Sequence, residues 1–330
     1  MIQRRTILNG AGLLAAGLAI PGLARAAGRP LRVAIVAKSL GNGFFNAVHL
    51  GGEEAAKSLG GIEMIFTGLT DTAAEHQIDV INSLVAQHVD AIVISANDPD
   101  ALVPVCRRAM QRGIRVISYD SGIAPEGRLL DLADATSTQV GVTLNQLAAD
   151  ACGGKGRIAV VSATATSTNQ NQWIAAMRAD MPNHSGLELV SVVYGDDLAD
   201  KSYRETQALL QKFSDLAVSV SPSSVGIVAA ARAVDDVGRS GKPFVTGLGL
   251  PGECIGAVTK GTIKSFAIWN PVDIGFAVVS ICAALVKGGD KRQIDAGRLG
   301  RIGFDADGRG TLGKPTIYDR SSVQAAAKLF

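Results

Sequence analysis

The chain of 330 residues is longer than one hydrophobic core usually fills, so we expect two domains of roughly 100–150 residues each. Hydrophobic residues make up 47% and charged residues 19%, a composition typical of globular α/β proteins that excludes a disordered chain or a disulfide-dominated scaffold. The formal net charge of +2 excludes the concentrated basic surface of a nucleic-acid-binding protein.

The first 26 residues have the pattern of a cleaved secretory signal peptide. Arg4 and Arg5 precede an apolar stretch at 13–20, and a small-x-small cleavage site follows at 24–26. The apolar stretch is far shorter than the roughly 20 residues that a membrane anchor needs. The paired arginines suggest the twin-arginine export route, although Gln3 and Asn9 depart from its strongest pattern. Loss of residues 1–26 removes three arginines and no acid, which changes the net charge to −1.

Short β-branched runs alternate with longer amphipathic stretches from residue 31 onward. Strands are predicted at Leu31–Ala37, Ile62–Thr67, Ala91–Ser95 and Arg115–Asp120, with helices at Phe45–Leu59, Ala73–His88 and Asp100–Arg112. A strand about every 28 residues, with a helix between, is typical of right-handed crossovers in a doubly wound parallel sheet.

A second series of the same kind follows. Strands are predicted at Ile158–Ser162, Leu187–Val193, Ala217–Ser221 and Pro243–Leu248, with helices near Gln170–Met181, Ser202–Phe213, Val225–Gly238 and Gly252–Lys260. The boundary near Asp134–Val140 has no Pro- or Ser-rich linker, so we expect a short strand-like crossing there. The predicted fold class is therefore α/β, with two doubly wound parallel-sheet lobes.

The last part of the chain is expected to return from one lobe to the other. A further strand is predicted at Ile263–Trp269 and a further helix at Val272–Val286. We assign residues 29–137 and about 265–292 to an N-terminal lobe, and residues 138–264 and about 293–330 to a C-terminal lobe. Several crossings would make a multi-strand hinge on which the lobes could close over a ligand.

Cysteine and histidine spacings give no sign of a metal site. The four cysteines lie far apart without a C-x-x-C pair, and the four histidines are equally scattered. An oxidising compartment would permit a disulfide, which the sequence alone does not establish. We expect no metal ion and no cofactor.

Polar and aromatic side chains gather where the predicted strands end, which is where ligands bind in open parallel sheets. Aromatic rings are concentrated there although only 15 of the 330 residues are aromatic. A sugar needs this mixture, because its hydroxyls donate and accept hydrogen bonds while its C–H faces pack on rings. The candidate residues are Lys38, Asn42, Phe44, Phe45, Asp120, Asn169, Gln170, Trp173, Trp269 and Asn270.

Several candidates have a purely structural alternative. An Asp after a strand is often a helix cap, and Asp120 could be one. Trp173 could pack in the interior, and of the consecutive Phe44 and Phe45 one is expected to belong to the core. Lys38 follows an apolar strand, where an ammonium has little reason to lie unless it reaches a polar partner. The conjunction of these residues, rather than any one of them, predicts a sugar site.

Catalytic and nucleotide-binding motifs are missing from the sequence. The run at 41–43 lacks the spacing of a dinucleotide loop and the GK[ST] ending of a phosphate loop. No G-x-S-x-G elbow, paired catalytic carboxylates or Cys–His constellation is present. We therefore expect a binding protein and not an enzyme.

Motifs along the chain resemble those of rhamnose-importer solute-binding proteins, within the ribose-binding-like group of type I periplasmic binding proteins. The similar stretches are AKSLGNGFF (37–45), ISANDPDAL (94–102), RAMQRGIRV (108–116), YDSGIAPEGR (119–128), TSTNQNQWI (166–174), VYGDDLADKSYRE (193–205), VTGLGLP (245–251) and FAIWNP (266–271). The resemblance implies a type I fold, a periplasmic location, and a monomer that delivers L-rhamnose to the transmembrane subunits of an ABC permease.

A related group that binds the quorum signal autoinducer-2 shares part of this pattern. The positions that match its binding residues are Lys38, Asp120, Gln170 and Pro222. That group has Asp where this chain has Asn169, and Ala where this chain has Ser224. Asn replaces a pure acceptor with a group that also donates, which favours rhamnose and leaves autoinducer-2 as the alternative.

Rhamnose has a methyl group where hexoses have a hydroxymethyl, so a rhamnose site needs an apolar wall. Leu250, Leu248 and Phe44 are the candidates for that wall. A sugar-responsive repressor uses the same two lobes but needs an N-terminal helix-turn-helix, where this chain has its predicted signal peptide. We therefore expect ligand capture without turnover and without a nucleic-acid partner.

Overall fold

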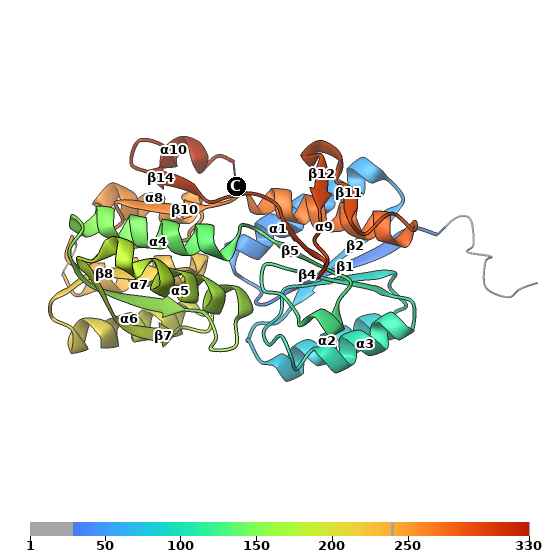
Figure 1. The fold of residues 1–330 in the computed structure, drawn as a ribbon, viewed down its shortest axis with the longest axis horizontal. Coiled ribbons are helices and arrows are strands. Elements are labelled where there is room, and N and C mark those ends of the chain that lie inside the picture. Colours follow the sequence, from blue (N-terminus) through green and yellow to red (C-terminus); the bar gives the residue numbers. More distant parts are fainter. Residues whose placement is uncertain (1–28, 239–240, 330) are drawn as a thin grey trace, which may run out of the picture. The chain divides into compact units, whose positions relative to one another are not determined.

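The computed structural model describes residues 29–238 and 241–329. The predicted signal peptide, residues 1–26, lies outside the described residues. In the described part, two larger sheets of parallel strands form, and each is the centre of one lobe (Figure 1). We call them the first lobe and the second lobe.

The first lobe is built on a six-stranded sheet in the order β13-β5-β4-β3-β1-β2, in which every neighbouring pair is parallel. Its strands are β1 (Leu31–Ala37), β2 (Ile62–Gly68), β3 (Ala91–Ile94), β4 (Arg115–Tyr119), β5 (Leu130–Ala133) and β13 (Arg309–Thr311). Its helices are α1 (Gly43–Leu59), α2 (Ala74–Ala86), α3 (Val103–Gln111), η1 (Pro125–Gly127) and α9 (Pro271–Val286). The hairpin of β11 (Gln293–Asp295), η3 (Gly297–Leu299) and β12 (Arg301–Gly303) packs beside α9.

Successive residues of β1 point to opposite faces of the first sheet, and both sets are fully buried. Val33 and Ile35 belong to a cluster with α1 and α9, whereas Ala34 and Val36 belong to another with α2 and α3. Helices therefore cover both faces, which explains why residues 33–37 of this strand are all apolar.

The second lobe is built on a four-stranded parallel sheet in the order β7-β6-β8-β9. Its strands are β6 (Gly156–Ser162), β7 (Leu187–Tyr194), β8 (Leu216–Ser221) and β9 (Phe244–Gly247), with β10 (Ser265–Ile268) bridged to the edge at β9 and paired antiparallel with β14 (Thr316–Asp319). Its helices are α4 (Ser137–Cys152), α5 (Thr168–Asp180), η2 (Met181–His184), α6 (Ala199–Lys212), α7 (Ser224–Asp236), α8 (Pro251–Lys260) and α10 (Val323–Ala326).

The predicted α/β fold class, with two parallel-sheet lobes, is confirmed. Strand β5 and helix α4 were not predicted. The crossing between them is therefore shorter than the strand-like segment expected at 134–140. Helix α4 begins at Ser137, and Thr136 and Gln139 form a capping box at its start. The Thr-x-x-Gln pattern and the buried Val140 and Leu144 were readable signals of this helix.

The assignment of the last strands to lobes also differs from the prediction. Strand β10 lies with the second sheet, although residues from about 265 onward were assigned to the N-terminal lobe. Strand β13 pairs with β5 of the first sheet, although residues 293–330 were assigned to the other lobe. Strand β13 is far in sequence from its partner β5, and β10 is far from its antiparallel partner β14, although it also bridges to β9, the strand before it. An apolar pattern does not specify which edge a strand joins.

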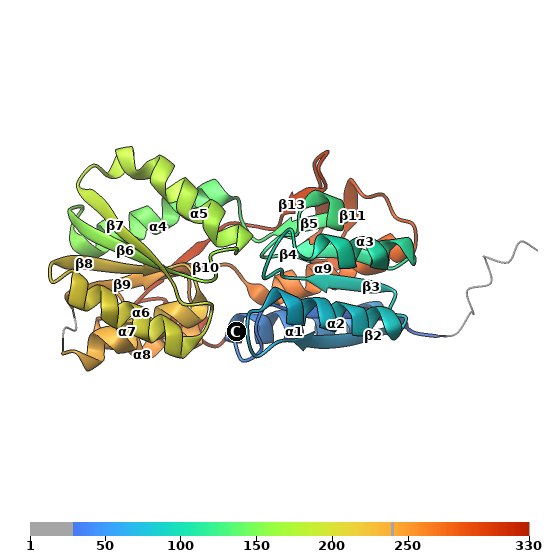
Figure 2. The ribbon, with the colours of Figure 1, turned by 90° about the horizontal axis from the view of Figure 1, so that it is seen from below.

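The chain passes between the lobes at 134–136, at 269–270 and at 312–315 (Figures 1 and 2). The first and last of these crossings are joined by backbone hydrogen bonds, from Leu312 N to Ala133 O at 3.0 Å and from Gly313 N to Asp134 O at 2.9 Å. Several parallel connections of this kind restrict relative motion of the lobes to bending at a few backbone positions.

Helices α1 and α9 run side by side and approach each other through glycines (Figure 1). A Cβ atom added at Gly275 would lie 1.8 Å from the backbone oxygen of Val48. We expect Gly275→Ala to lower the free energy of unfolding by about 1–3 kcal/mol, because backbone rather than a side chain must move.

Urea denaturation of the purified chain measures this loss. Gly256→Ala is the matched control, because this helical glycine of α8 has open space around its Cβ position and is expected to gain up to about 1 kcal/mol. A Gly275→Ala chain as stable as the wild type would contradict the close approach of α1 and α9.

Candidate functional site

The carboxyl ends of strands from both sheets meet at one cleft between the lobes. Its lining includes eleven of the thirteen residues predicted from the sequence: Lys38, Asn42, Phe44, Phe45, Asp120, Asn169, Gln170, Trp173, Pro222, Ser224 and Trp269. Leu250 and Asn270 are outside this lining.

Lys38, directly after β1, places its ammonium between two carboxylates from opposite lobes. Its Nζ lies 3.5 Å from Asp120 Oδ2 and 3.4 Å from Asp197 Oδ2, and it donates to Ser167 Oγ at 3.4 Å. Burial acts to lower the pKa of Lys38, but the charges of Asp120 and Asp197 outweigh it and leave the pKa raised. The cleft therefore contains a permanent, buried cation.

Asp120, directly after β4, is held by side chains and not by a helix start. Its Oδ2 accepts from Ser95 Oγ at 2.7 Å, and its Oδ1 accepts from Asn169 Nδ2 at 2.6 Å. Burial raises the pKa of Asp120, while the Lys38 ammonium lowers it, and the net direction is upward. The helix-cap alternative for Asp120 is therefore wrong, and its carboxylate lies at the centre of the polar network.

Two amides at the start of α5 are fixed in orientation. Gln170 Oε1 accepts from Ser162 Oγ at 2.8 Å and from Ala163 N at 2.7 Å, so its NH₂ group is the donor that it can offer to a ligand. Asn169 Oδ1 accepts from Gln170 N at 2.8 Å while its Nδ2 donates to Asp120. These bonds pre-organise the polar groups of the cleft before a ligand arrives.

The lobes contact each other across the cleft through further hydrogen bonds. Ser224 Oγ donates to Asn42 Oδ1 at 2.9 Å, and the same oxygen caps α1 by accepting from Phe44 N at 2.9 Å. Thr166 and Thr168 donate to backbone oxygens of Asn97 at 2.8 Å and of Gly122 at 3.0 Å. Both lobes thus supply parts of one site, which is in a closed arrangement.

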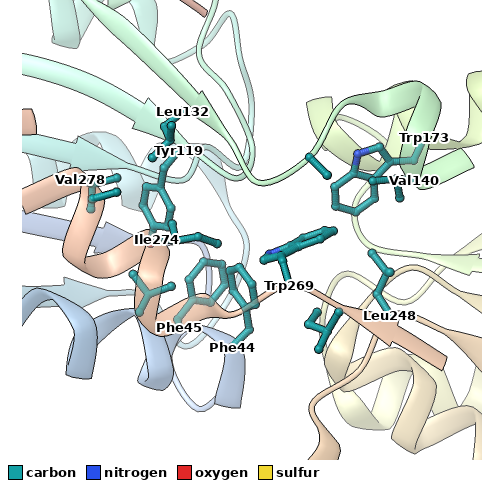
Figure 3. Close-up of a cluster of buried hydrophobic side chains, with 14 of the residues drawn as sticks. Phe44, Phe45, Tyr119, Leu132, Val140, Trp173, Leu248, Trp269, Ile274 and Val278 are labelled. Carbon is teal, nitrogen blue, oxygen red and sulfur yellow. The ribbon is translucent and has the colours of Figure 1, made fainter. Parts of the chain in front are cut away.

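Aromatic rings from both lobes line the cleft (Figure 3). Trp269 lies between Phe44, with ring centroids 6.5 Å apart, and Trp173, at 5.7 Å. The Nε1 of Trp269 is buried and has no hydrogen-bond partner among the described residues, so it is a donor available to a ligand. Phe45 lines the cleft as well and packs edge-on against Tyr119, so the expectation that only one of the two phenylalanines faces the cleft is wrong.

The two remaining predicted residues have structural roles. Asn270 Oδ1 accepts from Val272 N at 3.0 Å and caps α9. Leu250 precedes α8 and is buried against the start of α1, where its Cδ1 would lie 2.8 Å from a Cβ atom at Gly43. The apolar wall instead includes Leu248, which was considered for it, and Ile268.

Sequence reasoning missed Asp197, Ser223 and Ile268 in the lining. Asp197 follows β7, and the rule that ligands bind beyond the carboxyl ends of parallel strands would have found it. This strand end lies within the VYGDDLADKSYRE stretch at 193–205. Ile268 had no signal, because a buried apolar residue at a strand end is ordinary core.

A larger cavity of about 300 Å³ adjoins the cleft on the side of the crossings and shares Asp120, Asn169 and Trp173 with it. Asp134 lines this cavity, is 3% exposed, and neither carboxylate oxygen has a hydrogen-bond partner among the described residues. Burial raises the pKa of Asp134 well above its ordinary value of 3.8, and the Asp120 carboxylate raises it further.

The folded chain therefore keeps a proton on Asp134 that the unfolded chain releases above pH 3.8, so its contribution to stability falls as the pH rises through the raised pKa. We expect Asp134→Asn to be more stable than the wild type by about 1–3 kcal/mol at pH 7. The advantage should shrink toward pH 4. Urea unfolding of both chains at several pH values measures this, and an equal difference at pH 4 and pH 7 would contradict the raised pKa.

No helix among residues 29–238 and 241–329 is long and apolar enough to span a bilayer. In the same residues, no group of three or more His, Cys, Asp or Glu side chains is arranged to hold a metal ion.

Comparisons with known proteins agree with this architecture. A family model described as a periplasmic binding protein domain matches residues 33–290. An ABC transporter solute-binding protein from Clostridium phytofermentas, solved with bound L-rhamnose, is 34% identical, with 91% of this chain and 99% of that chain covered and a TM-score of 0.85. The D-ribose/D-allose-binding protein of Pseudomonas aeruginosa is 27% identical over 225 residues, 66% of this chain and 70% of its own length.

A more distant solved structure extends the likeness of fold. LsrB from Clostridium saccharobutylicum, in complex with AI-2, has a TM-score of 0.84 over 89% of this chain and 99% of its own. At 19% sequence identity, this similarity shows a common fold and no more.

Proposed function

We propose, starting from the fact that this chain belongs to the periplasmic binding protein family, that it captures a small neutral sugar in its interlobe cleft for an ABC-type importer. The family model and the similar solved structure show a periplasmic sugar-binding protein of the ABC-transporter family. The observation that carries the proposal is the convergence of one ammonium, two carboxylates, three amides and two indole rings on a single cleft.

The chemistry of the cleft fits a polyol. Carboxylate oxygens of Asp120 and Asp197 accept from hydroxyls, whereas Lys38, the Gln170 amide and the Trp269 indole donate to them. A micromolar site needs about 8 kcal/mol, which a few charge-assisted hydrogen bonds of roughly 1.5–3 kcal/mol each and ring stacking can supply.

The charge balance favours a neutral ligand. Lys38 is the one ammonium in the lining against the carboxylates of Asp120 and Asp197. A sugar acid or sugar phosphate would bring a further negative charge into this buried set, where the penalty for unpaired charge is large. Neutral sugars carry no such penalty.

L-Rhamnose is the ligand we propose. The relative from C. phytofermentas that holds this sugar is 34% identical over nearly the whole chain. The apolar wall of Phe44, Leu248 and Ile268 offers a surface for the methyl group at C6 of rhamnose. A hydroxyl at that position would be buried without a partner, which is unfavourable.

Titration calorimetry on residues 27–330 tests this assignment with L-rhamnose and L-mannose, which differ only by a hydroxyl at C6. We expect a micromolar Kd for L-rhamnose and binding of L-mannose at least about 10-fold weaker, because the extra hydroxyl meets the apolar wall. D-Ribose and D-glucose are further controls. Equal affinity for any of these three sugars would reject L-rhamnose as the selected ligand.

Autoinducer-2 is the second candidate. Lys38, Asp120, Gln170 and Pro222, which match the autoinducer-2 pattern, all line the cleft. At position 169 the carboxylate of that pattern would face Asp120, whereas Asn169 donates to it at 2.6 Å, and this difference favours the sugar. A thermal-shift screen with L-rhamnose and autoinducer-2 separates them, since only a ligand of the folded state raises Tm.

The remaining parts of the proposal concern export and partners. We propose that the chain is exported by cleavage of a signal peptide after Ala26, acts as a monomer, and docks in its closed form on the transmembrane subunits of an ABC permease. The N-terminal sequence and the native mass of the protein recovered from the periplasm test the first two statements. An uncleaved or oligomeric product would reject them.

A further inference from the structure

One of the two carboxylates of the cleft also makes an ionic contact between the lobes. Asp197, from the turn between β7 and α6, is the carboxylate of the second lobe that faces Lys38 of the first. We infer that the Asp197–Lys38 pair is a closing contact, which stabilises the closed cleft before any sugar is bound.

Lys38 makes one ionic contact within its own lobe and one with the opposite lobe. Lys38 follows β1 and Asp120 follows β4, two strands of the first sheet with β3 between them. Because both residues belong to one lobe, their contact at 3.5 Å survives when the lobes separate. The contact between Lys38 and Asp197 at 3.4 Å joins the lobes and is lost on opening. The three side chains are between 4% and 7% exposed, so solvent and salt screen this interlobe attraction only weakly.

Asp197 is positioned within its own lobe for this contact. Its Oδ1 accepts from Ser223 Oγ at 2.6 Å, and Ser223 also caps α7 by accepting from Gly226 N at 3.1 Å. The second lobe therefore presents the carboxylate in a fixed orientation, and little side-chain freedom is lost when the cleft closes.

The backbone supports the same conclusion. Asp120 and Asp197, one from each lobe, flank the same ammonium and both have left-handed backbone conformations, with φ of +54° and +52°. Aspartate is one of the few non-glycine residues that adopt this region readily. The two turns can therefore each present a carboxylate to Lys38.

The neighbouring residue provides a matched control. Asp196 has the same unusual conformation, with φ of +56°, but its carboxylate pairs with Lys201 of the same lobe. Asp197→Asn and Asp196→Asn each remove one charge from one turn, and asparagine tolerates left-handed backbone. Only the first substitution removes an ionic contact between the lobes.

The test is small-angle X-ray scattering of residues 27–330 without sugar, for the wild type, Asp197→Asn and Asp196→Asn. We expect the Asp197→Asn chain to have the larger radius of gyration, and the Asp196→Asn chain to match the wild type. Stopped-flow measurement with L-rhamnose should give about 10-fold faster dissociation for Asp197→Asn and no change for the control. Circular dichroism checks that all chains melt cooperatively.

Asp197→Gly is the second variant, because glycine adopts this backbone conformation without strain and its folding is therefore secure. It should open the cleft as Asp197→Asn does. The same radius of gyration for the sugar-free wild type and both Asp197 variants would overturn the closing contact. The inference rests on the proposed function only for its kinetic readout. If L-rhamnose does not bind, the ligand assignment fails while the scattering comparison still decides on Asp197.

Discussion

Replacement of Lys38 by methionine should weaken L-rhamnose binding by about 100-fold or more, the largest loss expected from a single substitution in this chain. Methionine keeps the length of the side chain but removes the ammonium that lies 3.5 Å from Asp120 and 3.4 Å from Asp197. Closure of the cleft would then bury two carboxylates without a cation between them. Titration calorimetry at pH 7 measures the loss.

The loss of affinity in Lys38→Met should depend on pH, and the charges around Asp120 determine the direction of this dependence. Without Lys38, the strongest influence that lowers the pKa of Asp120 disappears. Burial and the Asp197 carboxylate still raise this pKa, and only the hydrogen bond from Ser95 still lowers it, so the carboxyl binds a proton more readily. The affinity of Lys38→Met should therefore recover partly as the pH falls from 7 to 5. Lys201→Met, which removes the partner of Asp196 outside the cleft, is the control. A Kd of Lys38→Met within about threefold of the wild type would exclude Lys38 from the site.

Asp120→Ala should weaken L-rhamnose binding by about 10- to 100-fold, which corresponds to one or two charge-assisted hydrogen bonds. The substitution leaves Ser95 Oγ and Asn169 Nδ2 without their acceptor, while Lys38 keeps its contact with Asp197. The effect should therefore be smaller than that of Lys38→Met.

Asp120→Asn separates charge from shape in the same experiment. It retains the size of the side chain, tolerates the φ of +54°, and keeps one carbonyl acceptor, so we expect an intermediate affinity. Both chains should melt within a few degrees of the wild type, which would show that the loss is in binding. Unchanged calorimetric affinity in Asp120→Ala would remove Asp120 from the site.

The parts of the cleft that could be predicted from the sequence share one property. Lys38, Asp120 and Gln170 each lie within a few residues of the end of a buried strand, and the carboxyl ends of parallel strands meet at one edge of a sheet. Local pattern and this general rule were sufficient to place them together. Leu250 and Asn270 satisfy the same rule, yet one is buried against α1 and the other caps α9. Proximity to a strand end does not determine which way a side chain points.

The sequence by itself determined the α/β class, most strands and helices, and the majority of the residues around the cleft, because hydrophobic periodicity and turn chemistry are local properties. Only the tertiary structure decided that β10 extends the second sheet, that β13 joins the first, and that Asp197 reaches Lys38 from the opposite lobe. The contacts of β13 and Asp197 join residues far apart along the chain, and all three contacts depend on which sheet edge is free and how the two lobes meet. No local pattern of residues encodes that information.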